Sequence, residues 1–243
     1  MGKKRKDKAT GLTRREALTG AAATLGFGLA SGESLSAQER LAATLPGAKV
    51  CLLTPEAVKG PFYFDPKLVR ADIAEGRPGA PLALSLQVVS AKDCTRLNGA
   101  RVDLWHADGG GMYSGYPGQG DDGISTRGET FLRGTQFTGA DGQVRFATIY
   151  PGWYPGRTPH IHFKVLLDAT SLVTGQLYFP DDLSARIYAG RPPYDERKAK
   201  RDIVANDEDF IFQDQGGADT LARVTEEGGS YLASLVNGVN HDG

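Results

Sequence analysis

The fold of this chain is restricted most by a series of short runs in which apolar and polar residues alternate. In residues 82–89 every second position is Leu or Val, and residues 100–106 repeat the pattern through Val102, Leu104 and His106. Alternation with a period of two is typical of half-buried β-strands. Similar runs follow at 131–137, 143–150, 160–165 and 175–179. This spacing predicts a mainly β protein, an antiparallel sandwich or barrel with long loops and a little helix.

Turn-forming residues fill the segments between these runs. Gly139-Ala140-Asp141-Gly142 predicts a β-hairpin between the runs that flank it. The polar, glycine-rich residues 109–129 indicate a surface loop. Prolines interrupt residues 52–64, so an extended arm over the domain is expected there. Helical periodicity is confined to Asp219–Val236, where we expect a helix.

The first 37 residues have the features of an export signal. Basic residues precede the pair Arg14-Arg15 and a weakly apolar stretch, Ala17–Ala30, which is too short to span a bilayer. Residues 13–18 resemble a twin-arginine signal. We therefore expect an exported protein, periplasmic or extracellular, with general secretion as the alternative route and no stable membrane insertion after signal removal. Residues 38–50 are expected to be a linker, and residues 51–243 a single domain.

The charge of the remaining chain argues against nucleic acid as a partner. The first 37 residues hold seven of the 28 Lys and Arg and three of the 29 Asp and Glu, which leaves 21 and 26 and a net charge of about −5. Cys51 and Cys94 are the only cysteines. In an oxidising compartment they are expected to form a disulfide, and two free buried thiols are the alternative. The sequence is compatible with a homo-oligomer.

Two histidines in one candidate strand are able to bind a metal. His160 and His162 are two residues apart, so in a strand both imidazoles leave the same face, about 7 Å apart at the backbone. Ile161 and Phe163 then point to the other face and anchor the strand in the core. A bare His-x-His pair is more often two surface histidines. Here the chain has only four His, and Tyr154 lies just before the pair.

The nearby residues limit the choice of further ligands. No Asp or Glu stands at His-x-Asp or His-x-Glu spacing from this pair, and neither cysteine has a Cys-x-x-Cys partner. A site of two His and a carboxylate, or a cysteine-ligated zinc, is therefore not indicated. Tyr154 remains, with Tyr113 on the glycine-rich loop. A phenolate is a hard anionic donor that ferric iron is acidic enough to deprotonate, so two Tyr and two His indicate a ferric site.

The order in which several further motifs follow one another along the chain is a more specific signal than the His-x-His pair alone. These motifs are Gly60-Pro61-Phe62-Tyr63, Val102–Asp108 with Gly111-Met112-Tyr113-Ser114, Asp141-Gly142 with Phe146-Ala147-Thr148, Pro151-Gly152-Trp153-Tyr154, and Pro159-His160-Ile161-His162-Phe163. From about residue 51 to 180 the chain thereby resembles the intradiol ring-cleavage dioxygenases, the family of protocatechuate 3,4-dioxygenase and the catechol dioxygenases. This resemblance implies a β-sandwich core of the intradiol type.

The resemblance also implies an active site. It assigns the protein ligands of a non-haem Fe(III) to Tyr113, Tyr154, His160 and His162. Arg157 corresponds to the arginine that offsets negative charge on the substrate, Tyr154 also to a base for a substrate proton, and Gln176, with an offset of one residue, to an active-site glutamine. It assigns substrate binding to Pro61, Tyr63 and Arg157, although packing of the arm explains Tyr63 equally well.

The activity implied is cleavage of a catechol-type ring between its two hydroxylated carbons with O2, giving a cis,cis-muconate-type diacid without an organic cofactor. The spacer 155–159 is short for the family, and no long helical N-terminal domain is visible. Together with the export signal, these departures indicate an exported branch with an open pocket.

Two other functions stay open. One is a secreted β-sandwich binding module with a structural or vestigial metal site. The other is a copper or zinc enzyme that uses only His160 and His162. Three remaining interpretations are Trp105 and Phe62 as core or pocket wall, His106 as a structural histidine, and the acidic run 207–209 as a solvated face.

Overall fold

The structure is a computed structural model, and it describes residues 52–198 and 202–241. All of these residues belong to one compact unit. The expected export signal, the linker and Cys51 lie outside the described residues, and Cys94 is disulfide-bonded. Within the described part of the chain, no helix combines the length and apolar character needed to cross a membrane.

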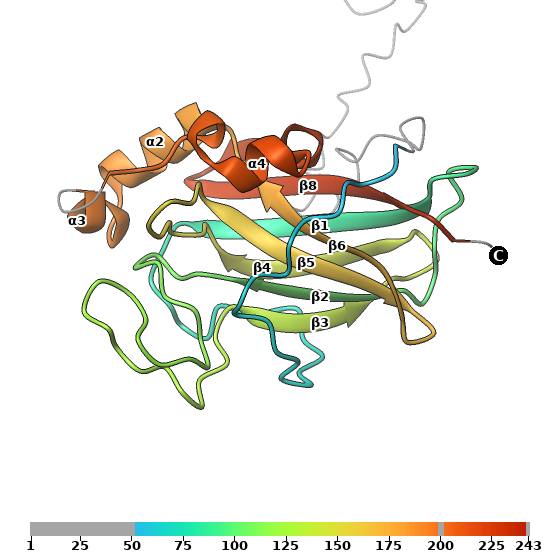
Figure 1. Cartoon of the computed structure of the whole chain (residues 1–243), viewed down its shortest axis with the longest axis horizontal. Helices are drawn as coiled ribbons and strands as arrows, with labels where there is room; N and C mark the ends of the chain where they lie inside the picture. The colour runs from blue at the N-terminus through green and yellow to red at the C-terminus, as the bar shows by residue number, and fades with distance from the viewer. Residues whose placement is uncertain (1–51, 199–201, 242–243) are drawn as a thin grey trace, which may run out of the picture. The chain divides into compact units, whose positions relative to one another are not determined.

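The described residues form eight strands in two four-stranded sheets (Figure 1). The first sheet has the order β4-β1-β8-β7, from Gln143–Ile149, Pro81–Ser90, Ser230–Val239 and Arg223–Glu227. The second has the order β3-β2-β5-β6, from Arg133–Phe137, Arg101–His106, His160–Leu167 and Thr170–Tyr178. The expected β-sandwich is therefore confirmed, with one difference: β1 and β8 run parallel.

The core lies between the sheets because alternate residues of each strand point inward. Leu84 and Leu86 of β1 join Val102 and Leu104 of β2 and Phe163 of β5 in one buried cluster. Each of these side chains contributes ~1.5–3 kcal/mol through removal of apolar surface from water. The intervening residues of β2, β5 and β6 point outward, so the polar residues of these strands gather on the outer face of the second sheet.

The predicted hairpin of residues 131–137 and 143–150 is wrong. Both strands exist, but β3 pairs with β2 and β4 pairs with β1, so the Gly139–Gly142 turn carries the chain from one sheet to the other. Gly142 has a φ of +69°, and a Cβ there would lie 2.7 Å from the Val88 carbonyl oxygen. A turn signal reports the local reversal of the chain, whereas the partner of each strand depends on distant packing.

The helix expected at Asp219–Val236 is also wrong. The segment contains the end of a 3-10 turn, Gly217–Thr220, followed by β7 and β8. Gly228 and Gly229 have φ values of 57° and 81° and reverse the chain between these strands. Strand β8 lies between β1 and β7 and is buried along most of its length. Burial of both faces removes the alternation that marks a half-exposed strand.

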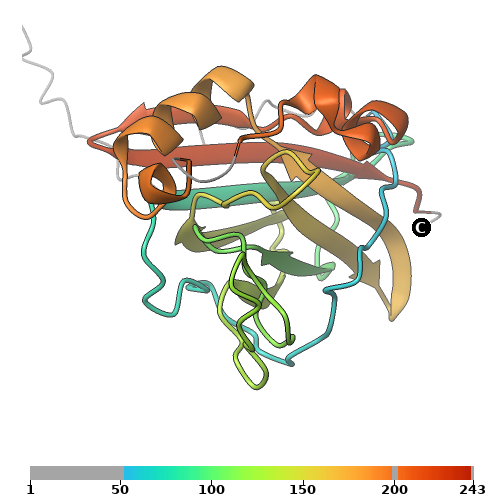
Figure 2. The same cartoon turned by 60° about the vertical axis from the view of Figure 1, so that its left-hand side comes forward.

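The helices are short and lie along one side of the sandwich in both views (Figures 1 and 2). They are α2 (Asp181–Gly190), α3 (Tyr194–Lys198), the 3-10 helix η1 (Asn206–Glu208), α4 (Phe210–Asp214) and the 3-10 helix η2 (Gly217–Thr220). Residues 52–64 form an extended arm, which bonds to Gly238 of β8 through Thr54 and to Thr174 of β6 through Ala57. The arm then continues over the outer face of the second sheet.

Candidate metal centre

The two strand histidines lie at the beginning of β5 on the outer face of the second sheet. His160 is opposite Tyr178 of β6, and His162 lies between Trp105 of β2 and Gln176 of β6. Both histidines are buried, and their Nε2 atoms are 3.2 Å apart. The alternation of the strand thus places both imidazoles on one face, as the sequence predicts.

Two tyrosines from different loops converge on the same point. Tyr113 follows β2, and its Oη is 3.4 Å from His160 Nε2; Tyr154 precedes β5, and its Oη is 3.1 Å from the same nitrogen. Tyr113 is fixed by its backbone, since its N–H donates to Gln119 Oε1 and its carbonyl accepts from Thr126 Oγ1. The structure therefore brings together all four side chains that the sequence suggests as metal ligands.

His160 is held in the tautomer that a metal ligand needs. Its Nδ1 is 2.7 Å from the Thr158 carbonyl oxygen. Because a carbonyl only accepts, Nδ1 carries the proton and Nε2 keeps a free lone pair. Burial lowers the pKa of His160 and of His162 well below the usual range, and the cation of Arg157 adds to this effect. Both imidazoles are therefore neutral, which is the form in which histidine binds a metal ion.

Burial acts on the tyrosines in the opposite direction. It raises the pKa of the Tyr113 phenol well above its usual value and raises the pKa of Tyr154 as well, although Arg157 partly offsets both effects. A buried phenolate is unstable without a nearby cation. The two phenols therefore keep their protons unless a strongly acidic metal ion binds them.

Aromatic residues and the arm form the walls around these donors. Trp105 stacks on His162 with ring centroids 4.9 Å apart and planes inclined by 4°. Phe62 stacks on Tyr113 with centroids 4.6 Å apart. The arm passes over His162 at Gly60, where φ is +70° and a Cβ would lie 3.4 Å from His162 Cε1. Trp105 and Phe62 are thus wall residues, in agreement with the sequence interpretation.

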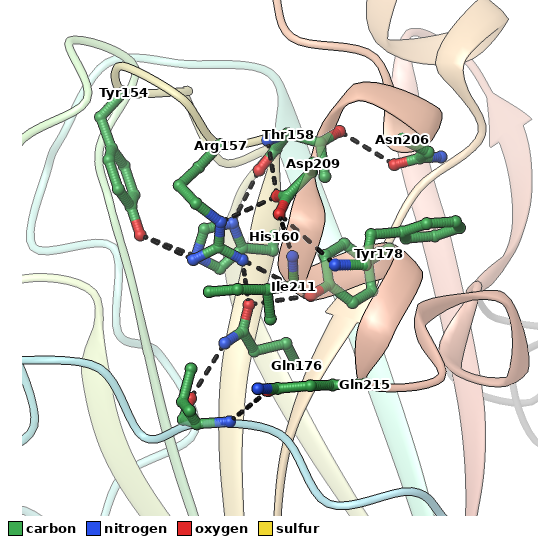
Figure 3. Close-up of polar contacts among 12 residues, drawn as sticks. Tyr154, Arg157, Thr158, His160, Gln176, Tyr178, Asn206, Asp209, Ile211 and Gln215 are labelled. Carbon is green, nitrogen blue, oxygen red and sulfur yellow. Dashed lines mark hydrogen bonds and ion pairs between the residues drawn. The ribbon is translucent and has the colours of Figure 1, made fainter.

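Arg157 is the cation of the site and is almost fully buried; Figure 3 shows it among Tyr154, Gln176 and Asp209. Its Nη1 donates to Tyr154 Oη at 3.3 Å, its Nη2 donates to Gln176 Oε1, and its Nε donates to Asp209 Oδ2 at 2.8 Å. Burial lowers the pKa of Arg157, but Tyr154 and Asp209 outweigh burial and raise the pKa above its usual value. The guanidinium is therefore permanently charged beside the four donors.

Gln176 belongs to the same network despite its offset in the sequence. Its Oε1 accepts from Tyr178 Oη at 3.0 Å, and its Nε2 donates to the Val58 carbonyl oxygen of the arm at 2.9 Å. Tyr178, which also lies 3.5 Å from Arg157 Nη2, is a site residue that sequence reasoning missed. It follows Gln176 by two residues, so the period of the strand was sufficient to find it.

Asp209 was assigned to a solvated face, and for this residue the interpretation is wrong. Asp207 and Glu208 are exposed, but Asp209 is fully buried and ion-paired with Arg157. One available signal was its position before the apolar residues 210–212, where an aspartate commonly caps a helix. The link to Arg157 spans about fifty residues of sequence and has no local signal.

Two of the three residues expected to bind substrate, Pro61 and Tyr63, are less central than Arg157. Pro61 is exposed in a turn of the arm. The Tyr63 hydroxyl donates to Asp103 Oδ2 at 2.8 Å, and its ring packs on Trp105, which favours a role in packing the arm. Both ring nitrogens of His106 are occupied by hydrogen bonds, as expected of a structural histidine.

The donor set suits a metal ion that accepts hard oxygen and imidazole nitrogen. Within the described residues, no three His, Cys, Asp or Glu side chains gather into a metal-binding group. The proton-free His160 Nε2 is instead surrounded by two phenol oxygens and a second imidazole. A cation between these four atoms would satisfy all of them.

A cavity of about 170 Å³ adjoins this centre. It is lined by aromatic residues and by loop residues, namely Phe62, Tyr154, Pro155, Gly111, Arg197 and residues 118–121. Of the four donors, Tyr154 is the one that lines this cavity.

Comparison with known proteins identifies the family of this chain. Residues 58–188 match the family model described as Dioxygenase. An intradiol ring-cleavage dioxygenase from Tetranychus urticae is 32% identical, with a TM-score of 0.72 over 78% of this chain and 95% of that one. The dioxygenase domain of a carbohydrate-binding fusion protein from Streptomyces sp. SirexAA-E is 30% identical, with a TM-score of 0.58 over 78% of this chain and 99% of that one.

Among curated proteins, catechol 1,2-dioxygenase 1 of Acinetobacter lwoffii is 29% identical over 152 residues, which cover 53% of this chain and 47% of that protein. The chain thus spans about half the length of the curated relatives it matches. The family model covers more than half of the chain, and the Tetranychus structure is matched over nearly its whole length. The chain belongs to the intradiol ring-cleavage dioxygenase family.

Proposed function

We propose that this protein is a non-haem Fe(III) intradiol dioxygenase that uses O2 to cleave catechol-type rings between their two hydroxylated carbons, giving cis,cis-muconate-type diacids. The observation that carries the proposal is the convergence of Tyr113, Tyr154 and His162 on the proton-free Nε2 of His160, within 3.1–3.4 Å. Two phenols and two neutral imidazoles form a donor set suited to ferric iron.

When bound by these four residues, ferric iron would supply Lewis acidity toward a catecholate and make its ring reactive toward O2. The protein supplies the remaining chemistry. Tyr154, the more accessible of the two tyrosines, is placed to accept a proton from a substrate hydroxyl. Arg157 places a fixed positive charge within 3.3 Å of the Tyr154 oxygen, where it would offset negative charge that develops on the substrate.

The substrate class rests on the relatives. The matched proteins are named for catechol, chlorocatechol and protocatechuate, and a cavity lies beside Tyr154. We propose catechol-type substrates as a class, with broad tolerance for ring substituents.

Two alternatives give different expectations. A β-sandwich binding module with a structural or vestigial metal site does not account for a buried arginine that donates from Nη1 to Tyr154 Oη beside the four donors. A copper or zinc site built on His160 and His162 leaves Tyr113 and Tyr154 without a role. The joint presence of both tyrosines and Arg157 favours the ferric dioxygenase.

We also propose that the protein is exported, by the twin-arginine route. The basic residues, the Arg14-Arg15 pair and the weakly apolar stretch after it support this proposal. The disulfide of Cys94 is in keeping with an oxidising compartment. Fractionation of cells that express the full chain, native or with Arg14 and Arg15 both changed to Lys, tests it, and retention of the native chain in the cytoplasm would contradict it.

The activity is tested by O2 uptake and product identification with iron-loaded protein. Catechol, protocatechuate, hydroxyquinol and a methoxylated catechol form the substrate panel. We expect O2 consumption with at least one of them and a muconate-type diacid by mass spectrometry. A semialdehyde product, which results from cleavage beside the two hydroxyls, or an absence of O2 uptake across the panel, would refute the proposal.

A further inference from the structure

Asp209 stands at the junction between the candidate centre and the C-terminal helices. It is fully buried, and both carboxylate oxygens are in use (Figure 3). Oδ2 accepts from Arg157 Nε at 2.8 Å and from the Thr158 N–H at 3.0 Å. Oδ1 accepts from the Ile211 N–H at 2.9 Å and the Phe212 N–H at 3.4 Å, which makes Asp209 the N-cap of α4.

The two oxygens of the Asp209 carboxylate therefore have different roles. One oxygen is locked by the first turn of α4, so the direction of the other oxygen is fixed. Of the three guanidinium nitrogens, that second oxygen engages only Nε, which leaves Nη1 free to reach Tyr154 and Nη2 free to reach Gln176. A planar guanidinium held at one edge presents its opposite edge at a defined place.

Asp209 also compensates the buried positive charge of Arg157. Arg157 is 8% exposed, and an arginine at such depth needs a partner to remain in place. Without a carboxylate at Nε, the guanidinium can turn toward water or collapse onto the phenol of Tyr154. With Asp209 in place, the positive charge keeps a single orientation before any substrate arrives.

The segment that carries Asp209 holds the arm as well. Gln215, the C-cap of α4, accepts from the Val58 N–H at 2.7 Å, while Gln176 donates to the Val58 carbonyl oxygen at 2.9 Å. The two ends of one short helix thus contact the arginine and the arm that covers the metal-binding histidines. This arrangement makes α4 part of the support of the site, although it contributes none of the four donors.

We propose that Asp209 is a positioning residue that sets the orientation of Arg157 for ring cleavage, an inference that rests on the proposed dioxygenase function. Asp209 acts through Arg157, and α4 acts through Asp209. The effect of a change at Asp209 therefore depends on whether Arg157 is present.

The test variant is Asp209→Asn. Asparagine caps helices as well as aspartate does, so its amide oxygen preserves the bonds to Ile211 and Phe212. Its NH2 group then faces the donors of Arg157 and Thr158, and the ion pair is lost. We expect kcat on the best substrate to fall by about 10- to 100-fold with a much smaller change in KM, since the lost interaction acts mainly in the transition state.

The matched control is Asp181→Asn. Asp181 anchors the same segment by accepting from the Asn206 N–H at 3.1 Å, and it has the same charge but no contact with Arg157. Its kcat is expected to stay within about twofold of the native value. Equal losses in both asparagine variants would mean that the segment matters only for folding, and would overturn the proposal.

A double-mutant cycle with Arg157→Gln separates positioning from general damage. If Asp209 acts through Arg157, adding Asp209→Asn to Arg157→Gln causes no further loss of kcat. The double variant should also unfold at a higher urea concentration than Arg157→Gln alone, because it no longer buries an unpaired carboxylate. Additive losses of kcat, or a double variant less stable than Arg157→Gln, would contradict the inference.

A measurement that needs neither iron nor activity distinguishes this inference from the proposed function. The Nε–H group of Arg157 should give a slowly exchanging ¹⁵N–¹H signal, identified by its loss in Arg157→Gln. We expect that signal to shift and exchange faster in Asp209→Asn but to remain unchanged in Asp181→Asn. An unchanged signal in Asp209→Asn overturns the positioning role even if ring cleavage is shown. A changed signal in a protein without ring-cleavage activity refutes only the catalytic use of that positioning.

Discussion

His106 should make the stability of this protein depend on pH in the acidic range. It is the last residue of β2 and is 1% exposed. Its Nδ1 is 2.9 Å from the Ala107 carbonyl oxygen, and its Nε2 is 2.8 Å from Thr148 Oγ1 on β4 of the other sheet. The neutral imidazole satisfies both contacts, donating from Nδ1 and accepting at Nε2. Burial, with a smaller contribution from Arg133, lowers the pKa of His106 from 6.5 to about 4.

The sign and size of the effect follow from this shift. Below pH 6.5 the unfolded chain binds a proton at His106, whereas the folded chain does not until about pH 4. The contribution of His106 to stability is therefore fully present above pH 6.5 and is lost as the pH falls toward 4. At about 1.4 kcal/mol per pH unit, the loss reaches about 3 kcal/mol at pH 4.

Urea unfolding between pH 7.5 and pH 4 measures this effect. The other buried histidines also resist protonation, so the informative quantity is the difference between native protein and His106→Gln, a neutral replacement. We expect the free energy of unfolding of the variant to fall less steeply with decreasing pH, by about 2 kcal/mol or more at the acidic end. Parallel curves for the two proteins would refute the assignment of His106 as a neutral buried histidine.

Three further predictions concern packing, the disulfide and the wall of the site. Gly175→Ala would place a Cβ 2.3 Å from the Phe163 ring in the core, so urea unfolding should show a loss of ~1–3 kcal/mol; an unchanged midpoint would show that the ring moves freely. Cys94→Ser should lower stability by ~3–4 kcal/mol, and native protein should resist alkylation until it is reduced; alkylation without reductant would contradict this. Trp105→Leu removes the plane that stacks on His162 and should weaken iron retention against a chelator by about 10- to 100-fold, while retention at the native level would assign Trp105 to packing alone.

The strands could be predicted from the sequence because alternation is a local signal. Residues 82–89 lie within β1, and residues 100–106 include the whole of β2. The His-x-His run begins β5. The sheet partners could not be predicted. The turn at Gly139–Gly142 joins two sheets, and the parallel pairing of β1 with β8 connects segments about 150 residues apart. These features depend on which faces are buried in the whole fold.

The residues of the site also divide into those that local sequence signals identify and those that depend on distant packing. The spacing of His160 and His162 and the resemblance of the surrounding motifs identified the four donors, and strand geometry explains why both imidazoles converge. The carboxylate that orients Arg157 was missed because Asp209 sits beside two exposed acidic residues and reaches the site only through the placement of α4. A residue that acts through a long-range ion pair leaves little trace in a single sequence.

The central claim is that two tyrosines and two histidines bind ferric iron, and the visible absorption spectrum of iron-loaded protein tests it most directly. Tyrosinate bound to Fe(III) is coloured, so we expect stoichiometric iron and a visible band that weakens or shifts in Tyr154→Phe. The band should persist in Tyr116→Phe, because the hydroxyl of Tyr116 in the native protein donates to the Tyr63 carbonyl oxygen and lies outside the donor set. His160→Ala should lose the iron. A colourless protein that nevertheless retains iron, or a band that is the same in Tyr154→Phe and in the native protein, would contradict the account.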